Sequence, residues 1–527
     1  MMLQLGPFAD FIRALFGPLT DFLGSLPLTD TMIMSLPAIT LIVFGILALA
    51  VGLRYNPLGV SVVGLILAAI EMVALDPLVA TIDTTNMQFV RDPMADFFIY
   101  IIIMVGFLVL MSSTLYGGNK GPYNFMLLVS FAGAMWVVMA VDLVGLFVGW
   151  EVMSTPTYIL VALGPGREAV DGATKYFVMG LLATMLMIFG IALVYGVTGT
   201  TVISEVAAAV AGIWDMSATM PNAAYTMMLA VILFIASFGF KVGVFPGWQW
   251  VPDAYASADG SVTSYLAGGS KKTGVGALMR ILIVGFVAAQ TEWMFLIAGV
   301  AILTMIIGNV LALAQKDIMR MLAYSSIAMM GYLFIGIASA PYADPTLILS
   351  DPTTYNYLVA AYNLGTGAAL FHAFTHAIMK TAAFILVWAL SIRLAKRITY
   401  DDLAGLSKKA PFVAAAFAIL MLSLAGMPLT VGFWSKLWLF QSAVFAGLWW
   451  LALIGLLNSV FSLGYYLRVL RYAYMVDSAD ENPIKMPTIP MVAVGVCVIA
   501  VFVLFFAPWI ISNYAFAAVP PVTPPVP

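Results

Sequence analysis

The chain has 527 residues, of which 63% are hydrophobic and only 9% are charged. A soluble globular protein carries roughly 25% charged residues, so this composition excludes one and indicates a chain whose apolar surface faces lipid. One cysteine, two histidines and a net charge of −3 exclude a cysteine-ligated cluster or a disulfide framework and argue against nucleic acid as a partner.

Residues 1–30 are predicted to form an interfacial segment. Apolar residues recur there at helical spacing, but Gly-Pro pairs at 6–7 and 17–18 interrupt them, and Arg13 is the one basic residue. A signal peptide would place positive charge before an unbroken apolar stretch, whereas a short amphipathic helix lies along the membrane surface. At the other end of the chain, the proline-rich residues 519–525 are predicted to be an extended tail.

Long apolar runs fill the sequence between these two ends. A membrane-spanning helix needs about 20 mostly apolar residues, whereas the strands of a membrane barrel would be about ten residues long with alternating polarity. The runs are long and apolar on all sides, which favours helices. The sequence therefore predicts an all-α polytopic membrane protein with about fourteen transmembrane helices, near residues 31–54, 58–80, 94–115, 123–140, 142–163, 172–197, 222–247, 261–289, 292–314, 318–340, 356–392, 410–440, 443–474 and 487–513.

Basic residues in the loops between these runs are distributed unevenly. Loops that follow odd-numbered helices hold 14 Lys and Arg residues, whereas the opposite side holds only 2, Arg13 and Arg91. Cytoplasmic loops of membrane proteins carry an excess of Lys and Arg. This asymmetry predicts an even number of helices in the cell membrane, with both termini on the outer side.

Six further basic residues fall inside the apolar runs, where a lysine costs on the order of 2.5–3.5 kcal/mol. Arg280 is interpreted as a snorkelling or packing residue. The five lysines are harder to dismiss, because three interruptions of the helices accompany them: Pro246 follows one, Pro428 precedes another, and glycines flank an adjacent pair. A broken helix at membrane depth usually lines a cavity, so an internal hydrated path is predicted beside Lys241, Lys271, Lys272, Lys380 and Lys436.

Glu151 is the most conspicuous carboxylate inside the runs. It could bond locally to Ser154 or Thr155, or it could pair with a buried lysine. A Glu–Lys pair that can separate changes the proton affinity of the lysine, which a proton relay requires. Asp76 is interpreted as a helix-end residue, and the role of Glu71 stays open.

His372, His376 and Lys380 are spaced four residues apart in the eleventh run. This spacing places them nearly on one helix face, about 6 Å apart along the axis per step. Histidine titrates near neutral pH and can pass protons, so a relay is the favoured interpretation. Packing is the alternative, and a metal site lacks further Cys, Asp or Glu ligands in this stretch.

Four segments of the sequence resemble the antiporter-like membrane subunits of respiratory complex I, a family shared with Mrp-type cation/proton antiporters: residues 142–151, 241–255, 320–326 and 425–436. The resemblance covers roughly residues 30–510. It implies two inverted five-helix repeats, helices 4–8 and 9–13, with helices 7 and 12 broken. The chain would then divide into an N-terminal segment (1–30), helices 1–3 (31–120), two repeats (121–290 and 291–475), and helix 14 with the tail (476–527).

The resemblance also assigns roles along a proton path. Glu151 and Lys241 match the ion pair of the family, and Lys436 matches the exit-side residue of helix 12. Either Lys271 or Lys272 is the central lysine; the spacing from Lys241 favours the first, and alignment on Gly274 favours the second. Met329 stands where the family usually has histidine, and a thioether cannot carry a proton. The remaining relay residues match helix 11 of some members: His372, His376 and Lys380.

The chain is most similar to the N-type subunit, although helix 11 is more like the L-type. The implied function is a proton-translocating subunit of a complex I-like oxidoreductase, in which this chain holds no redox centre and no metal. Flavin, iron–sulfur clusters and a membrane-soluble electron acceptor are expected in partner subunits, among them further antiporter-like subunits, small membrane subunits and a quinone-site subunit. The alternatives are an Mrp-type antiporter subunit without a redox partner and a scaffold that has lost transport.

Overall fold

The computed structural model describes residues 17–18, 20–25, 28–85, 87–216, 219–343, 347–478 and 482–521. Most of the predicted interfacial segment, residues 1–16, and the end of the predicted tail, residues 522–527, lie outside these ranges. Everything below concerns the part of the chain that is described.

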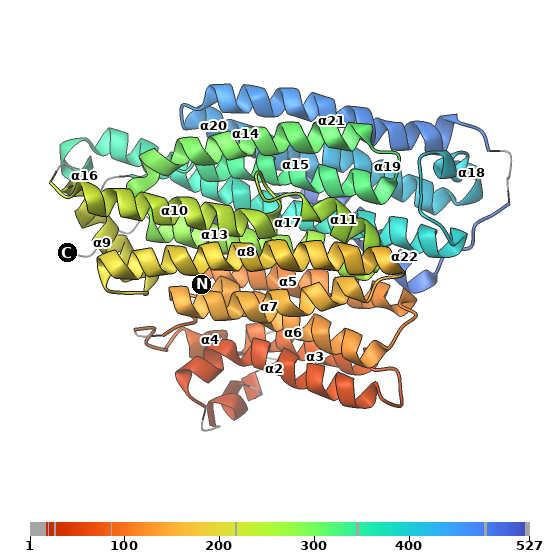
Figure 1. Ribbon diagram of the computed structural model, residues 1–527, viewed down its shortest axis with the longest axis horizontal. Helices are drawn as coiled ribbons and strands as arrows, with labels where there is room; N and C mark the ends of the chain where they lie inside the picture. The colour runs from red at the N-terminus through yellow and green to blue at the C-terminus, as the bar shows by residue number, and fades with distance from the viewer. Residues whose placement is uncertain are drawn as a thin grey trace.

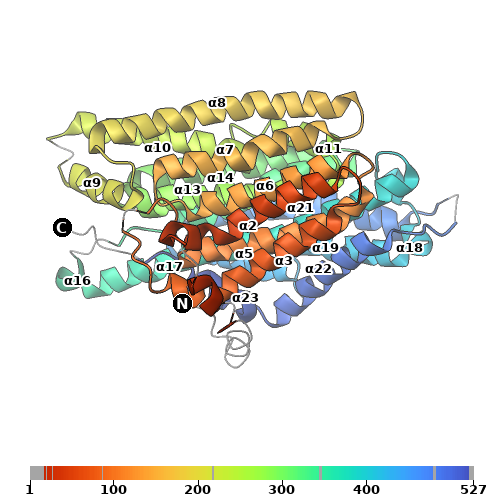
Figure 2. The same ribbon diagram turned by 90° about the horizontal axis from the view of Figure 1, so that it is seen from below.

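The described residues form long helices that run side by side along one direction, with no strand and only three isolated β-bridges (Figures 1 and 2). Eleven of these helices are long and apolar enough to cross a membrane. They contain α2 (Asp30–Val51), α5 (Pro93–Ser112), α6 (Lys120–Met139), α7 (Leu143–Ala162), α8 (Arg167–Thr198), α10 (Pro221–Val242), α14 (Gln290–Ala314), α15 (Ile318–Ala338), α17 (Pro352–Leu394), α21 (Trp449–Met475) and α22 (Thr488–Phe506).

The three remaining apolar runs form shorter pieces. The second run forms α3 (Leu58–Ala74), followed directly by the four-residue α4 (Asp76–Val79). The eighth run is divided into α12 (Gly260–Tyr265), the π-helical η2 (Leu266–Ser270), α13 (Lys271–Met279) and the π-helical η3 (Arg280–Gly285). The twelfth run is divided into α19 (Pro411–Ala425) and α20 (Val431–Phe445). Other short elements include α9 (Ile203–Asp215), α11 (Trp250–Ser257) and α23 (Trp509–Ala517).

Glycines with a left-handed backbone end two helices inside the bundle. Gly243 (φ 72°) ends α10, and a non-helical segment then leads to α11; Gly426 (φ 88°) ends α19 before α20 begins. Glycine adopts this conformation without the steric penalty of a side chain, which is why it commonly terminates helices. The last carbonyls of α10 and α19 are thereby left without helical partners in the interior.

The same pair of contacts, an aspartate N-cap and an isolated β-bridge, occurs at the start of α7 and at the start of α15. Asp142 caps the N-terminus of α7 and forms a β-bridge with Val202, beyond the end of α8. Asp317 caps the N-terminus of α15 and forms a β-bridge with Thr399, beyond the end of α17. The segments before α7 and α15 are therefore each fixed to the chain that follows the next long helix.

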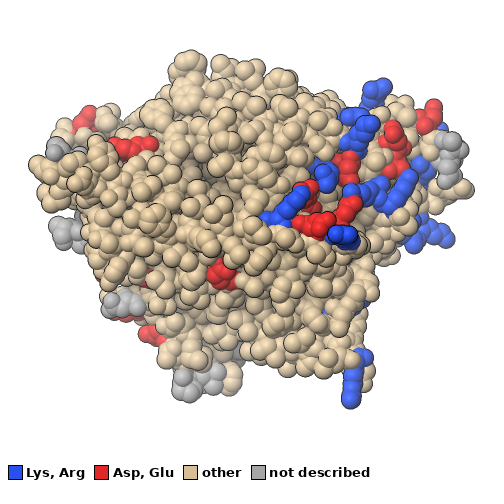
Figure 3. Space-filling view, viewed as in Figure 1, with Lys and Arg blue, Asp and Glu red and all other residues tan. Residues whose placement is uncertain are grey.

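Charged side chains gather at one end of the bundle, at the right of Figure 3, where blue and red atoms cluster. The face shown in that view is otherwise almost free of Lys and Arg along the helices. Ion pairs at the charged end include Lys396 with Asp402 and Lys408 with Asp477. An apolar flank with charge at the helix ends is the surface expected of a protein embedded in lipid.

Three charged residues inside the runs have protein partners. Arg280 does not snorkel: it is 3% exposed, and its guanidinium binds both carboxylate oxygens of Asp92 (2.7 and 3.0 Å) and the carbonyl of Val138 (2.9 Å). Asp76 opens α4 and pairs with Arg91 at 2.8 Å. Glu71 accepts a hydrogen bond from Thr40 at 2.7 Å.

Candidate functional site

Lys241 lies near the C-terminus of α10 and is buried against α7 and α8. Its ammonium donates to the hydroxyl of Tyr176 at 2.6 Å, to Ser154 Oγ at 3.1 Å and to Thr157 Oγ1 at 3.4 Å. The side chain is 1% exposed. Three hydroxyl oxygens therefore solvate the ammonium in place of water, which a buried cation requires.

Glu151 is not locally bonded, and it is not in contact with Lys241. Its Oε1 accepts a hydrogen bond from Thr184 of α8 at 2.7 Å, and no Glu151–Lys241 ion pair within 4.0 Å occurs among the described residues. Lys241 contacts Ser154, which lies one helical turn after Glu151 on α7. The two partners implied by the resemblance are thus neighbours on facing helices, but each is held by a hydroxyl.

Lys271 lies beside the interruption between α10 and α11. A side chain on Gly243 would come within 3.1 Å of the Lys271 ammonium, so the ammonium sits against the backbone that ends α10. The negative end of the helix dipole favours a cation there. The ammonium also donates to Ser326 Oγ at 3.3 Å and lies 5.3 Å from the centre of the Tyr255 ring.

Lys272 points in a different direction, toward α17. Its ammonium donates to the carbonyl of Ala267 at 2.7 Å and lies 2.5 Å from Nδ1 of His376. Both Lys271 and Lys272 are fully buried. Lys271 therefore faces the α10 interruption, and Lys272 faces the histidines.

The two histidines of α17 stack with ring centres 5.8 Å apart. His372 Nε2 lies 3.2 Å from the carbonyl of Met329, and Nδ1 lies 2.6 Å from Ser435 Oγ. A carbonyl only accepts, so Nε2 carries the proton and Nδ1 accepts from the Ser435 hydroxyl in the neutral imidazole. The backbone of Met329, not its thioether, thus orients His372.

Lys380 lies one turn beyond His376 on α17. It is fully buried, donates to the carbonyl of Leu322 at 2.9 Å, and makes a close hydrogen bond to the hydroxyl of Ser325. Ser325 directly precedes Ser326, which Lys271 contacts. Neighbouring serines of α15 therefore lie between these two lysines.

Lys436 of α20 occupies the second helix interruption. Its ammonium donates to the carbonyl of Ala425, the last residue of α19, at 2.8 Å and to Ser459 Oγ at 2.7 Å. A side chain on Gly426 would meet Lys436 Cδ at 2.7 Å. The lysine therefore needs the glycine beside it, and it satisfies a carbonyl that the broken helix leaves free.

We call the following seven residues the buried basic line: Lys241, Lys271, Lys272, His376, His372, Lys380 and Lys436. They come from α10, α13, α17 and α20, and all are at most 4% exposed. Their neighbours are hydroxyls, carbonyls and aromatic rings. The groups that contact the two imidazoles are the Lys272 ammonium, the Ser435 hydroxyl and the carbonyl of Met329, and an ammonium repels a metal cation. The chemistry that this set can perform is to hold and pass protons.

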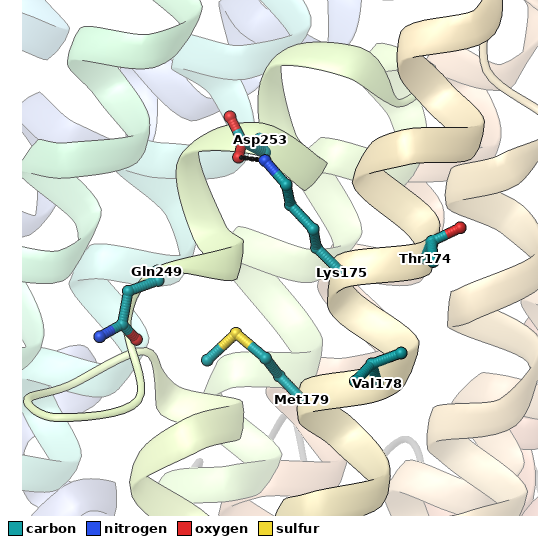
Figure 4. A pocket seen from close by; sticks show the side chains of 6 residues that line it. All are labelled: Thr174, Lys175, Val178, Met179, Gln249 and Asp253. Atoms are coloured by element: carbon teal, nitrogen blue, oxygen red, sulfur yellow. Dashed lines mark hydrogen bonds and ion pairs between the residues drawn. The ribbon is translucent and has the colours of Figure 1, made fainter.

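A groove opens on the surface between α8 and α11 (Figure 4), and one of its lining residues, Lys175, directly precedes Tyr176, a partner of Lys241. Lys175 reaches across it and pairs with Asp253 at 2.6 Å; Asp253 also pairs with Arg320 at 3.1 Å. The cavity has a volume of about 390 Å³ and is lined by Thr174, Lys175, Val178, Met179, Gln249 and Asp253. Asp253 and Arg320, which belong to two of the segments that carry the family resemblance, are thus in contact.

Sequence reasoning missed the uncharged members of the site, among them Tyr176, Thr184 and Ser435. Ser, Thr and Tyr cost little to bury when they are hydrogen-bonded, so they leave no clear signal in an apolar run. Tyr176 lies in the sequence 65 positions from Lys241, which it contacts. Only the fold brings the two together.

The fold and the site together define a multi-pass membrane protein with ionisable side chains in its interior. The model of the NADH:quinone oxidoreductase/Mrp antiporter transmembrane family matches residues 140–350 and 353–462. The chain belongs to this family.

Relatives are similar over most of their length. The chain is 35% identical over 408 residues to NADH-quinone oxidoreductase subunit N of Trichlorobacter lovleyi, covering 76% of this chain and 78% of the relative. It is 31% identical over 489 residues to F(420)H(2) dehydrogenase subunit N of Methanosarcina mazei, covering 88% and 93%.

Solved structures share the fold. Respiratory complex I from Thermus thermophilus matches with a TM-score of 0.71 and 25% identity, covering 93% of this chain and 100% of the other. A chain of the Mrp complex from Dietzia sp. matches with a TM-score of 0.76 and 21% identity, covering 93% and 97%. At that lower identity, the Mrp match shows the fold alone.

Proposed function

We propose that this chain is a proton-translocating membrane subunit of a complex I-like oxidoreductase. The observation that carries the proposal is the buried basic line, with Glu151 at its start. Seven basic side chains in a membrane protein are costly to keep, and here each has polar neighbours. The similarity to two N-type subunits of redox complexes favours this function over an Mrp-type antiporter.

The proposed path begins at the Glu151–Lys241 pair. A proton passes from Lys241 to Lys271 and Lys272. We assign both lysines to the path, because Lys271 lies against the end of α10 and Lys272 contacts His376 of α17. It continues to α17, where Lys380 lies beside Ser325, next to the Ser326 that Lys271 contacts, and His376 lies beside Lys272. His372 then leads to Lys436, because its Nδ1 accepts from Ser435, the residue before Lys436. Separation of Glu151 from Lys241 lowers the affinity of the lysine for its proton, since an opposite charge nearby favours the charged form.

We propose that the chain contains fourteen spans with two inverted five-helix repeats, residues 121–290 and 291–475, preceded by helices 1–3 and followed by helix 14. Three parallels support this division. Asp142 and Asp317 cap corresponding helices and form corresponding β-bridges. Gly243 and Gly426 each end a helix beside a buried lysine. We assign the interruptions after α10 and α19 to the broken helices 7 and 12 of this arrangement.

Redox chemistry belongs to partner subunits in this proposal. Flavin, iron–sulfur clusters and a membrane-soluble acceptor would lie in them, and this chain would contact further antiporter-like, small membrane and quinone-site subunits. The basic end of the bundle would face the cytoplasm by the positive-inside rule. Because α2 begins and α22 ends at the opposite end, both termini would face outward.

The test is Lys241→Ala in the assembled complex, reconstituted into vesicles with proton pumping and electron transfer measured in parallel. We expect pumping to fall while electron transfer persists at least in part. Lys316→Ala, at an exposed lysine between α14 and α15, is the control. An unchanged ratio of protons to electrons in Lys241→Ala would refute the proposed function.

A further inference from the structure

The partners of Lys241 and Glu151 form two separate sets of hydroxyls, although the two residues are close neighbours. Lys241 binds Tyr176, Ser154 and Thr157, whereas Glu151 binds Thr184. We propose that the Tyr176 hydroxyl is a second docking position for the Lys241 ammonium, and that Thr184 holds Glu151 while the pair is apart. This inference rests on the proposed function and makes Tyr176 and Thr184 positioning residues for it.

The two positions of the ammonium lie along one face of α7. Glu151, Ser154 and Thr157 are spaced three residues apart on this helix, a rise of about 4.5 Å per step. The Lys241 ammonium sits at the level of Ser154 and Thr157. Moving from its present position to Glu151 therefore takes one helical step, which the flexible four-carbon stem of a lysine allows.

The hydroxyl oxygens around Lys241 are oriented to accept hydrogen bonds from its ammonium. Thr157 Oγ1 donates to the carbonyl of Ser154 at 2.6 Å, and it lies 3.1 Å from the Tyr176 hydroxyl. The Tyr176 hydroxyl can donate to Thr157 and thereby leaves its oxygen free to accept from the ammonium. The ammonium also lies 5.6 Å from the centre of the Tyr158 ring. Such contacts stabilise a cation without a carboxylate.

Tyr176 is held by the interrupted helix. Its ring stacks on Trp250 at 4.0 Å between ring centres and 12° between planes. Trp250 opens α11, and its indole N–H donates to the carbonyl of Phe240 near the end of α10 at 2.8 Å. A movement of α11 relative to α10 would therefore move the docking position of Lys241. The interruption and the ion pair are coupled through this stack.

Tyr176→Phe removes the hydroxyl and keeps the ring, so it tests the docking position directly. A hydrogen bond to a charged group corresponds to about tenfold or more in an equilibrium. If the two positions are near balance, a tenfold shift lowers the Tyr176-bound population from about one half to about one eleventh. We expect proton pumping by the assembled complex to fall about fivefold, and a cryo-electron microscopy map to place Lys241 against Glu151.

Tyr195→Phe is the matched control, because this tyrosine lies on the same helix and is 56% exposed. Thr184→Val tests the other half of the inference: it frees Glu151 and is also expected to bring Lys241 toward it. If Lys241 stays at Ser154 in Tyr176→Phe and pumping is unchanged, the inference is wrong while Lys241→Ala still tests the function. If Lys241→Ala pumps normally, the proposed function itself fails.

Discussion

Gly426 offers a sharp test of how the second helix interruption holds Lys436. In Gly426→Ala the new Cβ would lie 2.7 Å from Lys436 Cδ, whereas carbon atoms pack at about 3.5 Å or more. The side chain must retreat by roughly 0.8 Å, which disturbs its 2.8 Å hydrogen bond to the carbonyl of Ala425. Loss of a hydrogen bond from a charged group costs about 1.5–3 kcal/mol. The left-handed backbone adds about 1–2 kcal/mol for a residue with a side chain.

Gly447→Ala separates these two effects. Gly447 also has a left-handed backbone (φ 78°), but a side chain there would meet nothing within 4 Å. Both variants should therefore lower the thermal stability of the purified complex, and only Gly426→Ala should also lower proton pumping relative to electron transfer. The comparison uses reconstituted vesicles with a pH-sensitive dye. Equal pumping in the two variants would show that contact between Gly426 and Lys436 is irrelevant to transport.

Two further predictions concern contacts that join distant segments. Arg280→Ala leaves the carboxylate of Asp92, which is 32% exposed, without its bidentate partner; losing hydrogen bonds between charged groups costs about 1.5–3 kcal/mol, so a drop in the thermal unfolding temperature of the complex is expected. Ser435→Ala removes the hydroxyl that donates to His372 Nδ1. Pumping should fall in this variant, and Ser435→Thr, which keeps a hydroxyl, should retain most of it.

Each of these predictions has a clear opposing outcome. Asp477→Asn affects a surface pair with an exposed carboxylate, for which less than about 1 kcal/mol is expected. If Arg280→Ala destabilises the complex no more than Asp477→Asn, the ion pair with Asp92 contributes little. If Ser435→Ala and Ser435→Thr pump equally, the orientation of His372 does not depend on this hydroxyl.

The helical fold could be predicted from sequence because lipid demands long apolar runs. Eleven of the fourteen expected runs form single long helices, and the other three are divided or shortened. Hydropathy alone does not detect such divisions. The local signals for them are Pro246, Pro428 and the glycines beside Lys271, and the regular α-helix stops near each of them. The residue at which each helix ends, Gly243 or Gly426, becomes visible only in three dimensions.

The charged members of the site could be predicted one by one, but their partners could not. Each buried lysine stands out because a charge in an apolar run is expensive. For Arg280 the snorkelling alternative is wrong and the packing alternative holds, but its partner Asp92 lies 188 positions away and no local pattern points to it. Likewise, the alternatives for Glu151 were local Ser154 or Thr155, or a lysine, whereas its acceptor contact is with Thr184 on the next helix.

The buried basic line contains seven bases and has Glu151 as its neighbouring carboxylate, so its occupancy is limited. Two unit charges about 8 Å apart repel by about 2 kcal/mol at an effective dielectric constant of 20, and several such repulsions would add if every base were protonated. Only a few protons can therefore reside there at once. In the proposed path, a proton that enters at one end would favour departure of another further along, as in single-file displacement, and Lys241 is the base for which we propose a movement.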